Sequence, residues 1–179
     1  MVKKMIIRTA KVVEYEKVKT FYYEIIDLME DMEYKPGWEK GIYPTDEYLK
    51  ESIKRQQLYV GTIDGEIVSA MAVNQSFNEE YKKVKWSVDA KVEEINVIHI
   101  LCVHPKVAHE GLAKEMVGWV IDFTRNNHQK AVRLDVLSGN VPAEKLYPSI
   151  GFKYITTERM YYEDTDWMDF LLFEYPIEA

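Results

Sequence analysis

A long apolar segment that leads directly into a helical segment limits the folds available to this chain more than any other feature. Residues 95–103 read INVIHILCV, without the alternation of a half-exposed strand. Such a run is typical of a strand buried on both faces, and Pro105 ends it because proline lacks a backbone N–H. Helical spacing then follows over residues 110–126. The predicted apolar face of this helix comprises Leu112, Met116, Trp119, Val120 and Phe123.

The rest of the chain predicts further strands and helices around this pair. Asp64-Gly65 is a strong signal for a tight turn between two strands. Apolar spacing predicts a helix over 14–32, and Thr45 is a suitable N-cap for a second helix that ends at Arg55. The other predicted strands are 5–9, 58–62, 66–73, 131–137, 152–162 and 168–175, with a short helix over 142–150. We predict one mixed α/β (α+β) domain over residues 3–178.

Composition and charge narrow the range of functions. The chain has 179 residues and a formal net charge of −7, which argues against a general nucleic-acid or anionic-membrane binder. The single cysteine, Cys102, excludes an intrachain disulfide and any multi-cysteine zinc site. No segment reaches the roughly 18 apolar residues of a membrane-spanning helix, and no signal peptide is recognisable. We expect a cytoplasmic protein with no metal, no nucleic-acid partner and no membrane partner.

The turn between the buried strand and the long helix is a candidate anion site. Gly111-Leu112-Ala113 opens the helix. The first N–H groups of a helix are unpaired and lie at the positive end of its dipole, so they bind phosphate groups. Gly111 would let an anion approach the backbone closely, and Ala113 keeps the first turn small. Taken alone, a glycine at such a place is more often a simple turn residue.

A second motif downstream makes the pattern much more specific. The segment LDVLSGNVPAEKLYPSIGFKY matches N-x-x-A-x-x-L-Y-x-x-x-G-F at every position, through Asn140, Ala143, Leu146, Tyr147, Gly151 and Phe152. Together with IHILCVHPKVAHEGLAKEMVGWVIDF, it resembles the GCN5-related N-acetyltransferase (GNAT) superfamily. The resemblance implies a central, mostly antiparallel twisted sheet of about six or seven strands flanked by about four helices. It also implies transfer of an acetyl group from acetyl-CoA to a primary amine by direct attack.

The resemblance further implies which residues would hold acetyl-CoA. The backbone of Leu101, Cys102 and Val103 would pair with the pantetheine arm, as an added strand does. Asn140 would contact this arm near its thiol end, and Ala143 would leave room for it. The predicted pyrophosphate residues are Ala108, His109, Glu110, Gly111, Leu112, Ala113 and Lys114.

One position departs from the family pattern. The family has an Arg or Gln where this chain has Ala108, so that side chain is missing. Family members hold the pyrophosphate mostly through backbone N–H groups, so the site can survive the change. Lys106 or Lys114 would supply compensating positive charge.

Acetyl transfer to an amine requires one group that takes the amine's proton and one that protonates the departing thiolate. By resemblance, Tyr147 would be the general acid; the alternative is a core tyrosine whose hydroxyl reaches the surface. His99 shares a strand face with Leu101, and an imidazole pKa near about 6.5 suits proton abstraction at neutral pH. His99 would therefore be the base or a water relay, as in the similar arylalkylamine N-acetyltransferases; the alternative is a histidine that only fills the core. Glu24, Glu93 and Glu94 are further candidates for the base.

Two further features have a structural and a functional interpretation. Cys102 lies among Ile, Leu and Val, and because a thiol in apolar surroundings is inert, we interpret it as a core residue rather than a nucleophile. Trp38 and Tyr43 lie in an irregular aromatic segment between the first two helices. Aromatic faces favour cations and apolar amine bodies, so both residues are predicted to line the acceptor side. The alternative is that they only anchor this segment on the core.

Other functions stay open at this point. A GNAT-like fold that senses acyl-CoA or another ligand without turnover is the main alternative; Ala108 favours it slightly, and Tyr147 and His99 oppose it. A nucleotide-binding α/β protein unrelated to GNAT is opposed by the motif over 140–152. The sequence does not distinguish a small-molecule amine from a peptide amine as acceptor. The paired C-terminal strands would suit the edge of a homodimer.

Overall fold

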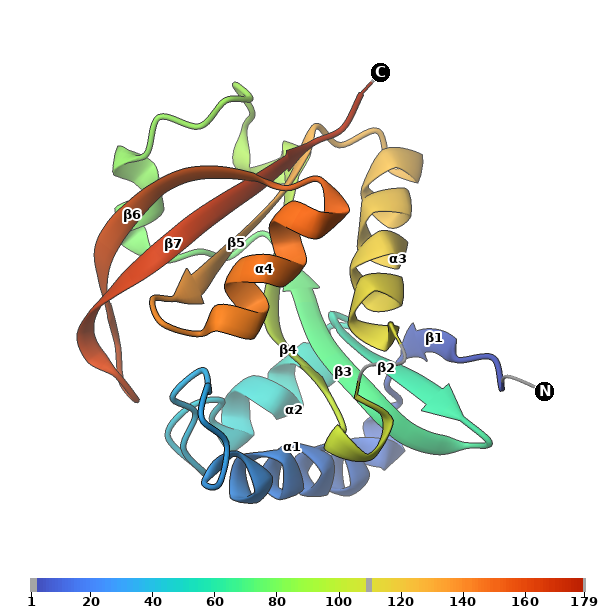
Figure 1. Cartoon of the computed structure of the whole chain (residues 1–179). Helices are drawn as coiled ribbons and strands as arrows, with labels where there is room; N and C mark the ends of the chain where they lie inside the picture. Colours follow the sequence, from blue (N-terminus) through green and yellow to red (C-terminus); the bar gives the residue numbers. More distant parts are fainter. Residues whose placement is uncertain (1–2, 109–110, 179) are drawn as a thin grey trace. The chain divides into compact units, whose positions relative to one another are not determined.

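The computed structural model describes residues 3–108 and 111–178, and Figure 1 shows its helices and strands. The strands are β1 (Ile6–Thr9), β2 (Leu58–Ile63), β3 (Glu66–Asn74), β4 (Ile95–Val103), β5 (Ala131–Leu137), β6 (Lys153–Tyr162) and β7 (Asp166–Pro176). The α-helices are α1 (Tyr15–Met29), α2 (Asp46–Lys54), α3 (Leu112–Asn126) and α4 (Val141–Ile150). Short 3-10 helices are η1 (Val12–Glu14), η2 (Glu79–Lys83), η3 (Val92–Glu94) and η4 (Pro105–Val107).

The strands form a seven-stranded sheet in the order β1-β2-β3-β4-β5-β7-β6. The pairs β1–β2, β2–β3, β5–β7 and β6–β7 are antiparallel, whereas β4 and β5 are parallel. A mostly antiparallel sheet accompanied by four α-helices confirms the predicted fold class. No helix in the described part of the chain is long and apolar enough to cross a membrane.

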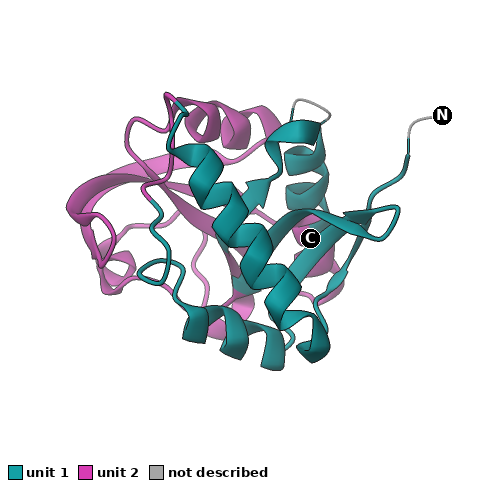
Figure 2. Cartoon of the chain, turned by 90° about the horizontal axis from the view of Figure 1, so that it is seen from below, with its two compact units in different colours: residues 1–32, 38–73, 99–119 teal, residues 33–37, 74–98, 120–179 magenta. Residues whose placement is uncertain are grey.

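The chain divides into two compact units, which Figure 2 colours separately. Unit 1 contains residues 1–32, 38–73 and 99–119, and unit 2 contains residues 33–37, 74–98 and 120–179. Strand β4 therefore begins in unit 2 and ends in unit 1, and α3 begins in unit 1 and ends in unit 2. The two units are described below one at a time.

In unit 1, α1 and α2 contribute buried side chains to the same core cluster as β2, β3 and the end of β4. Thr45 caps α2, because its Oγ1 accepts a hydrogen bond of 2.9 Å from the Tyr48 N–H. Asp64 and Gly65 have φ values of +52° and +81° and join β2 to β3 in a tight hairpin. Both features agree with the sequence prediction.

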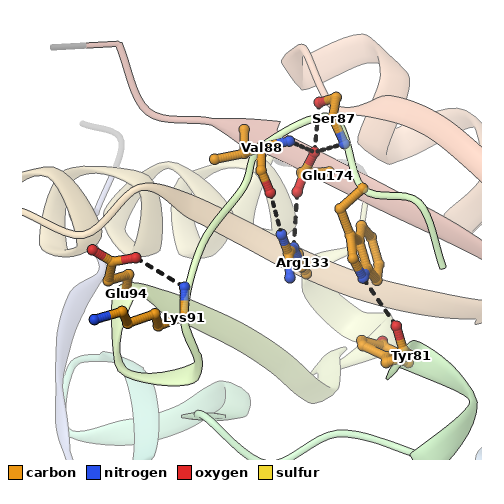
Figure 3. A network of polar contacts seen from close by, with 8 residues as sticks. Tyr81, Ser87, Val88, Lys91, Glu94, Arg133 and Glu174 are labelled. Atoms are coloured by element: carbon orange, nitrogen blue, oxygen red, sulfur yellow. Dashed lines mark hydrogen bonds and ion pairs between the residues drawn. The ribbon is translucent and has the colours of Figure 1, made fainter. Parts of the chain in front are cut away.

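In unit 2, the buried ion pair of Arg133 and Glu174 binds the loop at residues 86–88 to the sheet (Figure 3). The Glu174 side chain is fully buried, and its Oε2 accepts a hydrogen bond of 2.8 Å from Arg133 Nε. Glu174 Oε1 accepts from the backbone N–H groups of Ser87 and Val88 at 2.9 and 3.1 Å. The Arg133 guanidinium also lies 4.3 Å from the ring centre of Trp86. These contacts order residues 86–88, in a stretch for which the sequence pattern predicted no element.

Strand β4 differs from its prediction in one respect that matters for function. Its bounds are those predicted, but it is buried on both faces only over 95–98. From His99 onward, half-buried and buried residues alternate, because one face packs on the core of unit 1 and the other is partly open. The face of α3 also differs from its prediction: Trp119 and Phe123 are half-buried, and Val117 and Ile121 are buried instead.

Candidate functional site

The second half of β4 departs from regular strand geometry at Ile100. Its φ is +47°, in the left-handed region that β-branched residues rarely adopt. Such a conformation costs about 1–3 kcal/mol and persists only where the surrounding structure holds it. Here the fully buried Tyr22 on α1 donates a hydrogen bond of 3.0 Å from its hydroxyl to the Ile100 carbonyl.

Burial alternates along this end of β4. His99, Leu101 and Val103 are half-buried, whereas Ile100 and Cys102 belong to the core of unit 1. Burial raises the pKa of the Cys102 thiol, so it stays protonated and unreactive at neutral pH. The alternation gives His99 the same partly open face as Leu101 and Val103, and Cys102 the core face.

His104 organises the turn that follows β4, a role that the sequence analysis did not assign to it. Its backbone N–H donates to the Val68 carbonyl at 2.8 Å, and its Nδ1 accepts from the Lys106 N–H at 3.1 Å. Because Nδ1 accepts, the neutral ring carries its proton on Nε2, which lies 3.2 Å from Glu24 Oε1. The side chain and the backbone of His104 therefore both hold the turn through hydrogen bonds. The half-buried Ala108 closes the turn, because its N–H donates a hydrogen bond to the Pro105 carbonyl.

Gly111 stands at the N-cap of α3. Its carbonyl accepts the first helical hydrogen bond, 3.1 Å from the Glu115 N–H. Its φ is +80°, which glycine adopts without steric cost, and among the described residues, its chain neighbours aside, no atom lies within 4 Å of the position that a Cβ would occupy. The open space and the helix N-terminus together fit the close approach of an anionic group.

The other predicted pyrophosphate residues differ in exposure. Leu112 is buried, Ala113 is half-buried, and the Lys114 side chain is exposed. Leu112 thus anchors the first turn of α3 to the core, while Lys114 can reach an anion from solvent. His109 and Glu110 lie outside the described residues.

The second family motif lies in unit 2, on α4. Asn140 is the N-cap residue of this helix, and Ala143 is half-buried in its first turn. Tyr147 is 7% exposed, and its ring centre lies 5.5 Å from that of Phe152. Burial, with a smaller contribution from Asp135, raises the pKa of the Tyr147 phenol above its ordinary value. A tyrosine phenol of ordinary pKa is already protonated at neutral pH, as a general acid must be, and this shift keeps it so.

Strand β5 carries a carboxylate that the sequence analysis did not single out. Asp135 Oδ2 accepts hydrogen bonds from the hydroxyls of Tyr81 and Tyr162, at 2.7 and 2.9 Å. Desolvation raises the pKa of Asp135, and the two phenol donors offset part of that rise. A carboxyl group with a perturbed pKa in electrostatic reach of Tyr147 is a candidate acid–base residue. The available signal was an acidic residue inside the apolar strand AVRLDVL.

The three glutamates named as further bases have other environments. Glu24 is exposed and contacts His104, as described above. Glu93 is exposed in η3, ahead of β4. Glu94 accepts from the Lys91 N–H at 2.8 Å and pairs with Lys130 at 3.0 Å, and these contacts lower its pKa. A carboxylate stabilised in its charged form is a weak proton acceptor, so Glu94 is a poor base.

The two predicted acceptor residues are anchored on the core of unit 1. Trp38 and Tyr43 are half-buried and pack against its core cluster. The Trp38 ring centre lies 6.0 Å from that of Tyr22. Glu39 and Tyr43 exchange backbone hydrogen bonds of 3.0 Å, which close the turn between them. Anchored, partly open rings are compatible with both the structural and the ligand-contacting interpretation.

The candidate residues fall into both units. Unit 1 contains Trp38, Tyr43, His99, Leu101–Val103, Ala108 and Gly111–Lys114. Unit 2 contains Asp135, Asn140, Ala143 and Tyr147. A separate cavity of about 180 Å³ in unit 2, between residues 77–95 and Arg133, is lined by none of the predicted residues. Among the described residues, no group of three or more His, Cys, Asp or Glu side chains could hold a metal ion.

Comparison with known proteins identifies the family. The sequence model of the acetyltransferase (GNAT) family matches residues 22–152. A ribosomal protein bS18-alanine N-acetyltransferase of Haemophilus ducreyi is 26% identical over 97 residues, which are 54% of this chain and 67% of that relative. A GNAT-family acetyltransferase of Streptococcus agalactiae has the same fold, with a TM-score of 0.77 at 18% identity over 98% of this chain and 96% of that one. NAA60 of Arabidopsis thaliana, solved in complex with acetyl-CoA, has a TM-score of 0.68 at 16% identity over 97% of this chain and 100% of that one. Because the family match spans well over half of the sequence, the chain belongs to the acetyltransferase (GNAT) family.

Proposed function

We propose that this protein is an acetyl-CoA-dependent N-acetyltransferase that moves the acetyl group to a primary amine by direct attack. The observation that carries the proposal is the strand–turn–helix of β4 and α3 in a GNAT-family chain, with left-handed backbone at Ile100 and at Gly111. We also propose that residues 3–178 form a single N-acetyltransferase domain. We further propose a cytoplasmic location, since Cys102 is a free buried thiol, as is usual in a reducing compartment.

The residues of unit 1 fit CoA binding. Bound acetyl-CoA supplies the activated acyl thioester. The backbone of Leu101, Cys102 and Val103 would pair with the pantetheine arm as an added strand. The space beside Gly111 and the N–H groups of the first turn of α3, which have no partner within a helix, suit a pyrophosphate.

The proposed binding site lacks one side chain that the family pattern supplies. Ala108 offers neither a guanidinium nor an amide, so positive charge would come from the exposed Lys106 and Lys114. In unit 2, Asn140 would contact the CoA arm near its thiol end, and Ala143 would leave room for it. We expect CoA binding to depend more on backbone donors than on any one side chain.

Tyr147 is the proposed general acid. Its phenol is protonated at neutral pH, as that of an ordinary tyrosine is, and burial raises its pKa further. It would donate this proton to the thiolate as the carbon–sulfur bond breaks. A departing thiolate that gains a proton cannot attack the new amide, which favours completion of the transfer.

Two residues are proposed as alternative bases. His99 lies on the partly open face of β4, beside the backbone proposed to hold the acyl arm. Asp135 has a raised pKa and lies in the same unit as Tyr147. Either group would accept a proton from the ammonium form of the acceptor, directly or through a water, before the free amine attacks.

The acceptor is proposed to be a primary amine of a small molecule or a peptide. Trp38 and Tyr43 present partly open aromatic rings, which suit a cationic or apolar amine body. The name of the Haemophilus ducreyi relative specifies an alanine of ribosomal protein bS18, so a peptide α-amine belongs among the candidates. A homodimer through the C-terminal strands stays a prediction that light scattering can test.

The test is to incubate the protein with acetyl-CoA and a panel of amines, and to follow the release of free thiol. The panel contains a peptide that begins with alanine, a lysine peptide, an arylalkylamine and a polyamine. We expect thiol release above hydrolysis with at least one class of acceptor. CoA binding without thiol release for any amine would instead indicate a ligand-sensing module, and absence of CoA binding would overturn both interpretations.

A further inference from the structure

The cavity in unit 2 is lined by none of the described residues proposed for acetyl transfer, and nothing above gives it a role. Its volume is about 180 Å³, and its walls come from the segment between β3 and β4, from the start of β4 and from β5. An apolar cavity of about 150 Å³ holds one benzene molecule. The space in unit 2 therefore fits one small ring that carries a short substituent.

The segment between β3 and β4, residues 75–94, is bound to the sheet at several points and so keeps this space in place. The Asn78 side-chain amide donates a hydrogen bond of 3.0 Å to the Tyr161 carbonyl on β6. The Tyr81 hydroxyl donates one of 2.7 Å to Asp135 on β5. The buried ion pair described above holds the later half of the segment. A connection of this length is most often functional when it is ordered.

Aromatic rings contribute much of the cavity lining. The Phe77 and Tyr81 rings are almost parallel, with an interplanar angle of 5° and ring centres 5.5 Å apart. The Trp86 ring centre lies 5.3 Å from that of Tyr81. The remaining apolar lining includes Val84, Ala90 and Ile95. Such walls favour a flat apolar ring, which can stack on or lie edge-on to the aromatic side chains.

The charged side chains that line the cavity, Lys82 and Arg133, are both cationic, and no acidic residue of the described chain lines it. Arg133 is 6% exposed. Its Nε donates to Glu174 and its Nη2 to the Val88 carbonyl, each at 2.8 Å (Figure 3). Its Nη1 has no hydrogen-bond partner among the described residues. A guanidinium with a spare donor beside an apolar cavity favours a carboxylate, which forms charge-assisted hydrogen bonds.

We infer that this cavity is a binding site for a small aromatic monocarboxylate of about the size of benzoate. The ring would lie among the aromatic and aliphatic side chains, and the carboxylate would accept a hydrogen bond from Arg133 Nη1, near the Lys82 ammonium group. A neutral ring of the same size would make the same apolar contacts but leave the guanidinium donor without a charged acceptor. Because Tyr81 lines the cavity and also binds Asp135, an occupant would contact the partner of one proposed base.

Binding is tested without turnover, by fluorine-19 NMR of 4-fluorobenzoate titrated with the full chain at pH 7. 4-Fluorobenzamide has nearly the same shape without the charge, and acetate has the charge without the ring. We expect 4-fluorobenzoate to bind about tenfold more tightly than the amide, because hydrogen bonds to a charged acceptor are stronger. Acetate at the same concentration should not displace it, and saturating CoA should change its affinity less than about twofold.

Two substitutions test where the probe binds. Ala90→Leu adds an isopropyl group to the cavity lining, and we expect affinity for 4-fluorobenzoate to fall about tenfold or more. Lys82→Gln removes one cation from the lining and should cost about threefold, since this side chain is 62% exposed. Lys83→Gln is the matched control and should keep wild-type affinity. Lys83 is also exposed and also pairs with a glutamate three residues earlier, but it does not line the cavity.

The outcomes separate this inference from the proposed function. Folded wild-type protein that does not change the fluorine signal would overturn the inference, and equal affinities for the benzoate and the benzamide would overturn the carboxylate class. Displacement by CoA, or equal affinity in Lys82→Gln and Lys83→Gln, would place the probe elsewhere and overturn the site. Melting curves show whether each variant is folded, and the two lysine variants decide if Ala90→Leu is not. Protein that binds 4-fluorobenzoate in this pattern but does not bind acetyl-CoA would support the inference and overturn the proposed function.

Discussion

At the scale of single residues, the two proposed alternative bases, Asp135 and His99, would respond differently to a change in a neighbouring residue. The hydroxyl of Tyr81 stabilises the Asp135 carboxylate and lowers its pKa, so Tyr81→Phe would raise that pKa. In either case kcat/KM should rise with pH through the pKa of the base. If Asp135 is the base, the inflection moves to higher pH in Tyr81→Phe and disappears in Asp135→Asn.

If His99 is the base, we expect the inflection in the same pH profiles to respond to other substitutions. His99→Gln would remove the inflection and leave activity climbing toward the pKa of the amine itself, while Tyr81→Phe would leave the inflection in place. Melting temperatures of all variants should accompany the profiles, because a half-buried histidine also contributes to packing. A profile unchanged in both His99→Gln and Asp135→Asn would show that neither residue is the base.

Tyr147 is tested by removing one oxygen atom. Tyr147→Phe should leave CoA binding nearly intact and lower kcat by about 10²-fold, the usual scale for a general acid. Tyr154→Phe is the control, because residue Tyr154 is 54% exposed and its hydroxyl pairs with that of Thr157. Equal kcat values for the two variants would make Tyr147 a packing residue.

At the scale of elements, the start of α3 is tested by two substitutions at one position. Asn and Asp are nearly the same size and both tolerate the left-handed φ of Gly111 better than other side chains. Gly111→Asp adds a negative charge where a pyrophosphate would bind, and we expect CoA affinity to fall about tenfold or more. Gly111→Asn should lose much less, as measured by calorimetry. Equal losses would mean that bulk, rather than charge, decides the effect.

An ion pair at the junction of β1 and η1 should make the free energy of unfolding depend on pH. Arg8 donates two hydrogen bonds to the Glu14 carboxylate, and chiefly through them the pKa of Glu14 falls from 4.5 to about 2. A depressed carboxyl pKa stabilises the fold above the unfolded value and loses that effect as pH falls through the folded value. As the pH falls from 4.5 to about 2, the free energy of unfolding of the wild type should therefore decrease by about 1 kcal/mol or less. The decrease is small because the ion pair is partly solvated.

Glu14→Gln should lack this step when unfolding is followed by denaturant titration across the same pH range. Glu16→Gln is the control, because Glu16 is exposed and forms no salt bridge among the described residues. A wild-type step that persists in Glu14→Gln would assign the acid sensitivity to other carboxylates.

At the scale of the whole molecule, a ligand that binds only the folded protein raises its melting temperature by mass action. At a concentration of 100 Kd this stabilisation is about 2.7 kcal/mol. We expect CoA and acetyl-CoA to raise the melting temperature, and NAD and ATP to leave it nearly unchanged at the same concentration. Equal shifts for all four ligands would indicate a general nucleotide site.

Much of the fold could be predicted from local patterns. The mostly apolar runs at 95–103 and 131–137 have the bounds of β4 and β5, because polar residues or a proline stand directly before and after each run. Thr45 and Asp64-Gly65 act as cap and turn through contacts within a few residues. The family motifs are also local, since each spans one strand–turn–helix unit.

The sequence by itself therefore determined the α-helices and strands, the fold class and the family of this protein. Only the tertiary structure decided the backbone direction at Ile100, the environment of Asp135 and the path of residues 86–88. Each depends on hydrogen bonds between side chains and groups far apart in the chain: 78 residues separate Tyr22 from Ile100, and 87 separate Ser87 from Glu174. A periodic pattern reports which face of an element is apolar, but it does not report which distant donor will lie beside a given carbonyl or carboxylate. That pairing is set only when the elements pack, and it fixes the groups proposed here to carry the chemistry.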